Sequence, residues 1–199
     1  MKGILLLNGE PYKKDICADN ARTVCCDGAY LWAKGKVRID ENVGDFDSLS
    51  ILPDPPPARI YPSEKNFTDG EIGLERLLSF GCDEIEIYGT GGGREDHFLG
   101  NLHLLYRALS GGARVTAFTN GARIYAVFDE FFLYGQTGKT ISLLPFGGEA
   151  HIINSRGLKY PLEDLTLSYG SCRGISNVVT SAEAYFHCVS GMVLVFVNE

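Results

Sequence analysis

The stretch "DEIEIYGTGGGREDHFLGNLHLLYRALSGG", residues 83–112, contains a predicted strand, a glycine loop and a predicted helix in immediate succession. Residues 83–89 alternate polar and apolar side chains, which is typical of a β-strand. Residues 94–112 indicate a helix that stops at the pair Gly111–Gly112. A strand that passes through glycines into a helix is a building unit of α/β folds, so this stretch predicts the fold class.

The same alternation extends over the first 120 residues. Thr68 and Glu71 form a capping-box pair at the start of another helix, and Gly81 is placed to end it. Alternating strands and helices predict a mostly parallel, Rossmann-like sheet with helices on both faces. The expected strands span residues 3–9, 23–30, 59–62, 83–89 and 113–120, and the expected helices span 29–36, 68–81 and 94–112.

Beyond residue 120 the pattern changes to short strands without helices between them. Such spacing, with glycine, asparagine, serine and proline between the strands, is typical of an antiparallel β-sandwich or barrel. We expect a β-sandwich here, and hence two domains, residues 1–120 and 121–199. The expected strands span residues 123–128, 130–135, 139–147, 149–154, 165–170, 184–189 and 192–199.

Composition and charge exclude several classes of protein. The 199 residues carry a net charge of −7, which argues against a nucleic-acid partner because that partner requires a basic surface. The sequence has no apolar run long enough to cross a membrane, and its start reaches glycine and charge too early for a signal peptide. The six cysteines show no C-x-x-C pair and no zinc spacing, so we expect a cytoplasmic protein with free thiols.

Acidic side chains follow several of the predicted strands. Asp27 comes directly after the second strand, Asp45 and Asp47 lie in "NVGDFDSLS" (residues 42–50), and Asp69 lies in the first turn of a helix. In an open parallel sheet, the loops at the carboxyl ends of the strands form the ligand site. These loops therefore predict one common binding site.

The glycine loop within residues 88–101 belongs to the same predicted site. Its glycines let backbone amides approach an anion, the helix start adds a positive dipole end, and Arg94 is placed to fork onto phosphate oxygens. The loop lacks the Gly-Lys-Ser/Thr of a Walker A motif, and Arg94 replaces the last glycine of a dinucleotide fingerprint. The sequence thus predicts a phosphate site that neither common motif describes.

Asp45, Asp47 and Asp69 offer oxygen atoms alone, without a cysteine or histidine cluster beside them. In an extended segment the carboxylates of Asp45 and Asp47 point the same way, and they repel each other unless a cation lies between them. Oxygen ligands shared with phosphates are typical of Mg²⁺. The pattern predicts metal-assisted transfer of a phosphoryl-type group from a nucleotide.

Each feature also has a purely structural explanation. Asp27 can cap a helix, as can the pair Thr68 and Asp69, while "GDFDS" (residues 44–48) can form an acidic turn and the glycines a surface hairpin. His97 alone is more often a packing or capping residue than a base. Four loops of one sheet would each need such an explanation independently, so their co-occurrence favours a functional site.

Four motifs occur in an order that resembles one family. They are "CDGAY" (26–30), "VGDFDSLS" (43–50), "KNFTDGEIGLERL" (65–77) and "GTGGGREDHFLGNLHLL" (89–105), and the tail "GLKYPLEDLTLSYGSCRGISN" (157–177) agrees with them. Together they resemble thiamine pyrophosphokinase of the bacterial type over nearly the whole chain. The resemblance implies a homodimer that transfers the diphosphate of ATP to thiamine, giving thiamine diphosphate and AMP.

The resemblance also implies roles for single residues. Asp45, Asp47 and Asp69 would hold Mg²⁺ against the ATP phosphates, and Asp96 and Asn101 would lie between the phosphates and thiamine. Asp96 is our candidate for the proton acceptor. The expected nucleotide-binding residues are Asp27, Ser48, Asn66, Thr68, Gly91, Gly92, Gly93, Arg94 and His97. The thiamine rings would be covered by Tyr160, Ser176 and Asn177 of a second subunit. The resemblance accordingly implies that residues 121–199 bind thiamine and form the dimer.

Two positions depart from the family pattern. Asn66 stands where the family usually has an aspartate, and Val178 follows Asn177 where an acidic residue is often found. Two other functions remain open at this point. One is transfer of a phosphate or diphosphate to another small alcohol, such as a pterin or a pyrimidine, and the other is a nucleotide-binding sensor without catalysis.

Overall fold

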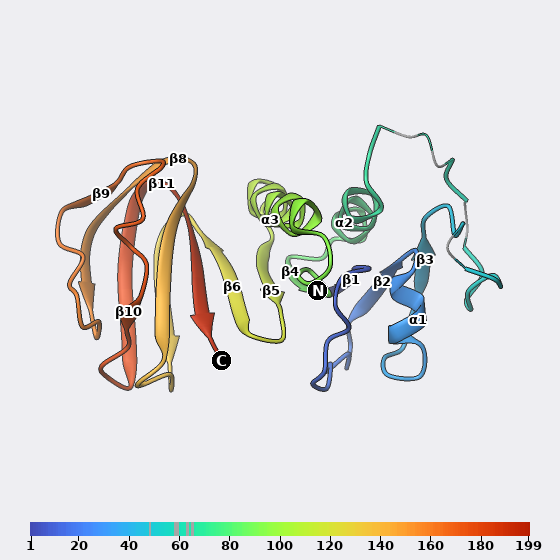
Figure 1. Ribbon diagram of the computed structural model, residues 1–199, viewed down its shortest axis with the longest axis horizontal. Helices are drawn as coiled ribbons and strands as arrows, with labels where there is room; N and C mark the ends of the chain where they lie inside the picture. Colours follow the sequence, from blue (N-terminus) through green and yellow to red (C-terminus); the bar gives the residue numbers. More distant parts are fainter. Residues whose placement is uncertain (48, 58–59, 63, 65) are drawn as a thin grey trace. The chain divides into compact units, whose positions relative to one another are not determined.

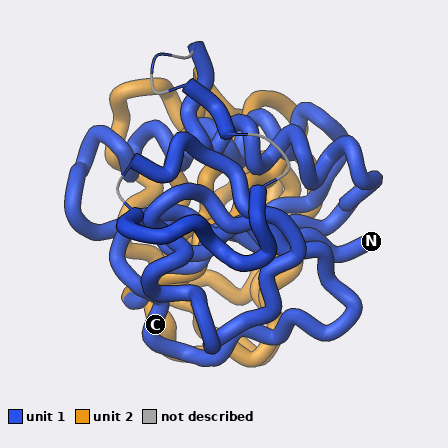
Figure 2. The backbone as a smooth tube through the Cα atoms, turned by 90° about the vertical axis from the view of Figure 1, so that its right-hand side faces the viewer, with its two compact units in different colours: residues 1–120 blue, residues 121–199 orange. Residues whose placement is uncertain are grey.

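The computed structural model describes residues 1–47, 49–57, 60–62, 64 and 66–199 and shows a mixed α/β protein (Figure 1). The chain forms two compact units, residues 1–120 and residues 121–199, which are coloured separately in Figure 2. The mixed α/β class predicted from the sequence is therefore confirmed. Within the described ranges, no helix combines the length and the apolar character that a membrane span requires.

Unit 1, residues 1–120, is built on a parallel sheet. Its strands are β1 (Lys2–Leu6), β2 (Arg22–Cys26), β3 (Glu41–Val43), β4 (Glu84–Tyr88) and β5 (Arg114–Phe118), in the spatial order β5-β4-β1-β2-β3. The chain runs from β1 outward to β2 and β3, and then returns to the other side of β1 for β4 and β5. The strand order thus reverses between β1 and β4, and such a switch point is where open α/β sheets bind ligands.

Helices pack on both faces of this sheet. They are α1 (Ala29–Ala33), α2 (Asp69–Ser79) and α3 (Glu95–Ser110). Ile4 and Leu6 of β1 share a core with α1, whereas Leu5 faces α2, because successive side chains of a strand alternate. A Cβ atom at Gly73 of α2 would lie 2.6 Å from Leu5 Cδ1, so the close approach of α2 to the sheet requires glycine at this position.

The start of α2 confirms the predicted capping box. The Thr68 backbone N–H donates to Glu71 Oε2 at 2.8 Å, and the Glu71 backbone N–H donates to Thr68 Oγ1 at 3.2 Å. Such a cap contributes about 1 kcal/mol to helix stability. The helix ends at Ser79, two residues before Gly81, which has a left-handed φ of 77°. The predicted stop signal at Gly81 is therefore confirmed.

Two predictions for unit 1 need correction, and one strand was missed. The strand expected over residues 59–62 is not formed at residues 60–62, and Arg59 lies outside the described residues. The helix expected over 29–36 ends at Ala33. The strand β3 was not predicted, because its three residues are too few for an alternating pattern to stand out.

Unit 2, residues 121–199, is an antiparallel arrangement around two long strands. Its strands are β6 (Ala122–Val127), β7 (Glu130–Tyr134), β8 (Thr140–Arg156), β9 (Leu165–Leu167), β10 (Asn177–Val178) and β11 (Glu183–Asn198). Strands β8 and β11 pair with each other along most of their length. The first part of β8 also pairs with β10 and its last part with β9, while β7 and β6 pair with the two ends of β11. Leu143 and Ile152, from the two parts of β8, face one shared core.

The sequence predicts four short strands where the structure has the two continuous strands β8 and β11. The glycines that suggested turns lie at irregularities inside the strands instead. Gly191 adopts a left-handed φ of 74°, and a Cβ atom there would lie 2.0 Å from the Glu149 carbonyl oxygen. The register of β11 against β8 shifts between His187 and Met192, as expected for β-bulges, which bend a strand without ending it.

Candidate active site

The loops at the carboxyl ends of β1, β2, β3 and β4 form the candidate site. The loop after β1 touches two of the others. A Cβ atom at Gly28, just after β2, would lie 2.4 Å from Asn8 Nδ2, and the Glu10 backbone N–H donates to the Gly91 carbonyl at 2.6 Å. Sequence reasoning did not single out Asn8 or Glu10. The signal that was available is their position directly after the strand at which the sheet order reverses.

The carboxylates of Asp27, Asp45 and Asp47 form one group. One oxygen of each lies within 4.8 Å of an oxygen of the other two. Asp27 and Asp45 are half-buried and Asp47 is exposed, so the group opens to solvent. The loops after two neighbouring strands, β2 and β3, therefore direct three negative charges to one place, as the sequence predicted for Asp45 and Asp47.

The reason given for that convergence was wrong. Residues 45–47 are not extended, because Phe46 has a left-handed φ of 57°. The Phe46 side chain is buried. The Asp47 backbone N–H lies 3.3 Å from Asp45 Oδ1, so the segment is a tight turn. The turn folds the two carboxylates onto the same side, and Phe46 anchors the turn to the protein.

Of the remaining acidic and polar candidates, the structure places Asp69 near Cys26, the residue before Asp27. The Cys26 thiol donates to the Asp69 carbonyl at 3.3 Å, so Asp69 begins α2 beside the residue that precedes Asp27. Asp69 is nevertheless not a member of the close carboxylate group found among the described residues, and its place in the metal site stays a prediction. Asn66 is exposed, the Thr68 hydroxyl is engaged in the helix cap, and Ser48 lies outside the described residues.

The glycine loop between β4 and α3 is held by its neighbours on both sides. Gly92 and Gly93 have left-handed φ angles of 78° and 80°, and a Cβ atom at Gly92 would lie 2.4 Å from Glu10 Cβ. On the helix side, Asn101 Nδ2 donates to the Thr90 carbonyl at 2.8 Å. Asn101, predicted to lie near the substrates, therefore serves first to fix the loop to α3.

Arg94 and Asp96 form a two-pronged ion pair at the start of α3. Arg94 Nε lies 3.1 Å from Asp96 Oδ1, and a terminal guanidinium nitrogen lies 2.6 Å from Oδ2. The Arg94 hydrogen bonds lower the pKa of Asp96 to about 2, and a bond from the backbone N–H of His97, whose side chain is exposed, acts in the same direction. Asp96 is therefore a carboxylate at neutral pH but a weak base while it keeps this partner.

The variant Arg94→Ala is expected to raise the pKa of Asp96 from about 2 toward the ordinary aspartate value of 3.8. The lowered pKa means that the wild-type Asp96 carboxylate is still charged near pH 3. At the same pH the Asp96 side chain of the variant becomes mostly protonated. A carboxyl ¹³C NMR titration measures this directly. An unchanged titration in the folded variant would show that Arg94 does not control Asp96.

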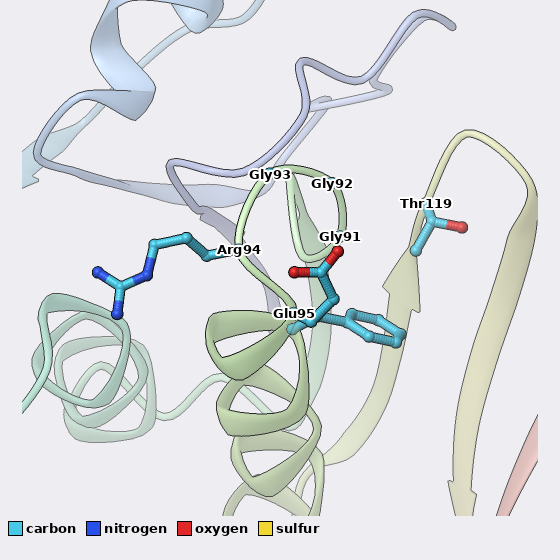
Figure 3. A pocket seen from close by; sticks show the side chains of 7 residues that line it. Gly91, Gly92, Gly93, Arg94, Glu95 and Thr119 are labelled. Atoms are coloured by element: carbon cyan, nitrogen blue, oxygen red, sulfur yellow. The ribbon is translucent and has the colours of Figure 1, made fainter.

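A pocket of about 250 Å³ opens beside the same loop. It is lined by Gly91, Gly92, Gly93, Arg94, Glu95, Phe98 and Thr119. Figure 3 shows the Glu95 side chain on the side of the helix start that faces Thr119, whereas the Arg94 side chain extends the opposite way. The two side chains thus leave the start of α3 in opposite directions. Glu95, Phe98 and Thr119 were not among the residues predicted from the sequence.

The three candidates in unit 2 have different roles in the structure. The Tyr160 side chain is 56% exposed and available for contact. Asn177 is buried, accepts from the Tyr160 backbone N–H at 3.0 Å and donates to the Tyr160 carbonyl at 2.7 Å. Its carboxamide is therefore occupied in holding Tyr160 in place. Ser176 is exposed and has a left-handed φ of 63°.

The carboxylate group fits a hard divalent cation. Asp27, Asp45 and Asp47 offer oxygen donors alone, which is the ligand type that Mg²⁺ prefers, and no thiol or imidazole within the described residues joins the group. Three carboxylates this close repel one another, and a bound cation removes that repulsion. Phosphate oxygens of a nucleotide would complete the coordination.

Comparison with known proteins gives matches along the whole chain. The family model described as "Thiamin pyrophosphokinase, catalytic domain" matches residues 13–117, and "Thiamin pyrophosphokinase, vitamin B1 binding domain" matches residues 132–193. The thiamine pyrophosphokinase of Bacillus subtilis (strain 168) is 30% identical over 162 residues, which are 77% of this chain and 76% of the relative. Thiamin pyrophosphokinase 1 of Caenorhabditis elegans is 24% identical over 217 residues, which cover 94% of this chain and 85% of that relative.

Solved structures show the same fold. The crystal structure of thiamine pyrophosphokinase from Bacillus subtilis superposes with a TM-score of 0.86 at 24% identity and covers 100% of this chain and 99% of the other. The thiamin pyrophosphokinase from Candida albicans gives a TM-score of 0.70 at 18% identity and covers 99% of this chain and 88% of the other. With the catalytic-domain model covering more than half of the sequence, and a curated relative at 30% identity over most of it, the chain belongs to the thiamin pyrophosphokinase family.

Proposed function

We propose that this protein transfers the diphosphate group of ATP to thiamine, giving thiamine diphosphate and AMP. The observation that carries the proposal is the order of the two domain matches, a catalytic domain over residues 13–117 followed by a vitamin B1 binding domain over residues 132–193. The finer description of the fold, a Rossmann-like half and a β-sandwich half, belongs to the same proposal. It is supported by the parallel and antiparallel strand pairings of the two units.

The reaction forms one bond and breaks one. The hydroxyl oxygen of thiamine attacks the β-phosphorus of ATP, the bond from that phosphorus to the oxygen bridging to the α-phosphorus breaks, and AMP leaves with the electron pair. The hydroxyl proton passes to a base or to water. A primary alcohol is a poor nucleophile, so positioning and charge neutralisation supply most of the rate enhancement.

Asp27, Asp45 and Asp47 are the residues that would hold Mg²⁺. Asp69, which the sequence predicts as a metal ligand together with Asp45 and Asp47, would join them as a fourth carboxylate. Bound there, the cation would neutralise charge on the phosphate oxygens and on the departing AMP. The carboxylates themselves fix the place of that positive charge at the carboxyl edge of β2 and β3.

Arg94 and Asp96 would act together in the transfer. A phosphate group can replace the Asp96 carboxylate as the partner of the Arg94 guanidinium, because each of them offers two acceptor oxygens to the two guanidinium N–H groups. Loss of that partner would return the pKa of Asp96 from about 2 toward its ordinary value and make Asp96 a better proton acceptor. ATP would thereby prepare the base that the thiamine hydroxyl needs.

The thiamine side of the site is proposed in unit 2. Thiamine carries a fixed positive charge, and the face of an aromatic ring such as that of Tyr160 attracts a flat cation. A homodimer, in which Tyr160 and Ser176 act on the site of a second subunit, follows from the resemblance and stays part of the proposal. The free state of all six cysteines is consistent with the expected cytosolic location.

One incubation tests the proposed reaction. Purified protein with Mg²⁺, ATP and thiamine is expected to give AMP and thiamine diphosphate in equal amounts, resolved by chromatography. ADP with thiamine monophosphate would contradict the diphosphate transfer. ATP binding without any thiamine product would contradict thiamine as the acceptor, and pterin or pyrimidine alcohols would then be tried in its place.

A further inference from the structure

We propose that the buried side chain of Asn42, in β3, positions the turn that carries Asp45 and Asp47. It does so by anchoring residues 49–57, which follow the turn in the connection between β3 and α2 (Figure 1). The inference rests on the proposed function for the role of the two carboxylates as Mg²⁺ ligands. Asn42 would act on them through the backbone, as a positioning residue.

Asn42 is a polar residue in an otherwise apolar place. It is 1% exposed, and the next residue of the strand, Val43, is also buried. Asn42 Nδ2 donates to the Pro55 carbonyl at 2.7 Å, whereas Asn42 Oδ1 is buried without a hydrogen-bond partner among the described residues. Burial of an unpartnered amide oxygen destabilises a fold, and an apolar side chain would avoid that loss. The bond to Pro55 is therefore the feature that explains a polar side chain here.

A second buried side chain holds the same point of the connection. The hydroxyl of Tyr30, in α1, accepts a hydrogen bond from the Asp54 backbone N–H at 3.1 Å. Asp54 and Pro55 are consecutive, so Asn42 and Tyr30 fix one point of the chain from a strand and from a helix. This point cannot move without breaking a hydrogen bond to a buried side chain.

The turn itself depends on the connection that is anchored in this way. Phe46 has a left-handed φ of 57°, a conformation that is disfavoured for residues other than glycine and persists only where the surrounding structure holds it. The Leu49 backbone N–H donates to the Phe46 carbonyl at 3.1 Å, and the Tyr61 backbone N–H donates to the Gly44 carbonyl at 3.0 Å. The chain thus leaves the turn and returns to it, and the anchored point lies between these two bonds.

A purely structural role for Asn42 is the alternative, and it has different consequences. If the bond to Pro55 serves only to stabilise the fold, its loss lowers the melting temperature and leaves the Mg²⁺ affinity of the folded molecules unchanged. If Asn42 positions the carboxylates, its loss weakens Mg²⁺ binding in a protein that remains folded. The same substitution therefore separates the two roles.

The first variant is Asn42→Leu, because leucine has the same branching at Cγ but no donor. Calorimetry measures the Kd of Mg²⁺ in the presence of α,β-methylene-ATP, an analogue that cannot transfer its diphosphate. Loss of one hydrogen bond is expected to raise this Kd about fivefold. The melting temperature should stay within about 4 °C of the wild type, because the substitution also removes the unpartnered amide oxygen.

The second variant is Tyr30→Phe, which removes the other anchor and should also raise the Kd of Mg²⁺ about fivefold. The double variant is expected to lose about as much as either single variant, because one substitution already releases the connection. A rise of about 25-fold, the product of two independent losses, would contradict a shared anchor.

Amide hydrogen exchange gives a readout that needs neither metal nor nucleotide. The Leu49 N–H closes the turn by its bond to the Phe46 carbonyl, so its exchange reports opening of the turn. Asn42→Leu is expected to speed this exchange about fivefold and to leave the amides of β1 as in the wild type. Wild-type exchange at Leu49 together with a wild-type Kd of Mg²⁺ in folded Asn42→Leu would overturn the proposal.

The matched control is Thr23→Val in the neighbouring strand β2. Thr23 is fully buried, and its Oγ1 atom also lacks a partner within the part of the chain that the structure describes. Valine has nearly the same shape, so this variant removes an unpartnered polar atom from the sheet and leaves the bond to Pro55 in place. It should change neither the Kd of Mg²⁺ nor the exchange of Leu49. Equal effects in Thr23→Val and Asn42→Leu would contradict the role of the Pro55 bond.

These outcomes are separable from those of the proposed reaction. Exchange and Mg²⁺ binding are measured without thiamine, so they decide the role of Asn42 even where no thiamine diphosphate is formed. In steady-state kinetics, Asn42→Leu should raise the Mg²⁺ concentration that gives half the maximal rate about fivefold and leave kcat at saturating Mg²⁺ within twofold. If thiamine diphosphate is formed and Asn42→Leu binds Mg²⁺ as the wild type does, the reaction stands and the positioning role is wrong.

Discussion

Replacing Asp47 with asparagine is expected to lower kcat/KM about 10³-fold while the folded structure is retained. Asp47 is exposed, and its carboxylate lies in the group with Asp27 and Asp45, so the substitution removes charge from the proposed metal site without removing packing. The loss should be largest at limiting Mg²⁺, and calorimetry should show weaker Mg²⁺ binding in the presence of α,β-methylene-ATP. Circular dichroism and thermal unfolding check that the fold is intact.

The control for charge alone is Asp15→Asn, an exposed aspartate of unit 1 that is not among the candidate site residues, which should retain wild-type activity. Wild-type activity of folded Asp47→Asn at limiting Mg²⁺ would remove the metal-site assignment. The same Mg²⁺ titration on Asp27→Asn and Asp69→Asn separates the two candidates for the third ligand. The carboxylate group of the structure predicts the larger loss of Mg²⁺ affinity for Asp27→Asn.

The second large effect is expected from Gly92→Ala, which should lower kcat/KM about 10²-fold. A Cβ atom at this position would lie 2.4 Å from Glu10 Cβ, so either the glycine loop or the loop after β1 must move. A displacement of about 1 Å at a substrate-positioning loop is enough for a loss of this size. Steady-state kinetics with varied ATP, together with the Kd of α,β-methylene-ATP, would locate the defect in nucleotide binding.

Gly93→Ala separates steric clash from backbone strain. Gly93 has a φ of 80°, nearly the same as the 78° of Gly92, but a Cβ atom at Gly93 would meet open space. Both variants should lose roughly 1–2 kcal/mol of stability from the left-handed conformation, and Gly92→Ala should lose much more activity. Gly100→Ala, in the exposed part of α3, should keep full activity and gain up to about 1 kcal/mol of stability. Equal activity losses in Gly92→Ala and Gly93→Ala would show that contact with Glu10 is unimportant.

The sequence by itself determined what depends on neighbours in the chain. The succession of strand, glycine loop and helix over residues 83–112, and the cap formed by Thr68 and Glu71, arise from local periodicity and local hydrogen bonds. Local patterns of this kind can be recognised without a structure, and the elements that they predicted here were confirmed. The ordered motifs likewise sufficed to indicate the family, because each motif is a short contiguous segment.

Sequence reasoning failed where a distant contact overrides a local signal. The glycines near Gly191 suggested turns, but pairing of β11 with β8 continues through them as bulges. The segment around Phe46 was expected to be extended, but the buried Phe46 ring holds it as a tight turn. In both cases burial and pairing with a remote segment decide the backbone conformation, and neither is visible in a short window of sequence.

The tertiary structure alone decided which residues meet in the site. It brings Asp27 to Asp45 and Asp47 because β2 and β3 are neighbours in the sheet, and it places Glu10 against Gly92 because β1 and β4 are neighbours. It also gives Asn177 and Asn101 fixed internal hydrogen bonds, although both were expected to contact substrates. The sequence thus determines which chemical groups are present and the local elements that carry them. Their meeting depends on strand order and packing between residues far apart in the chain, which only the folded structure specifies.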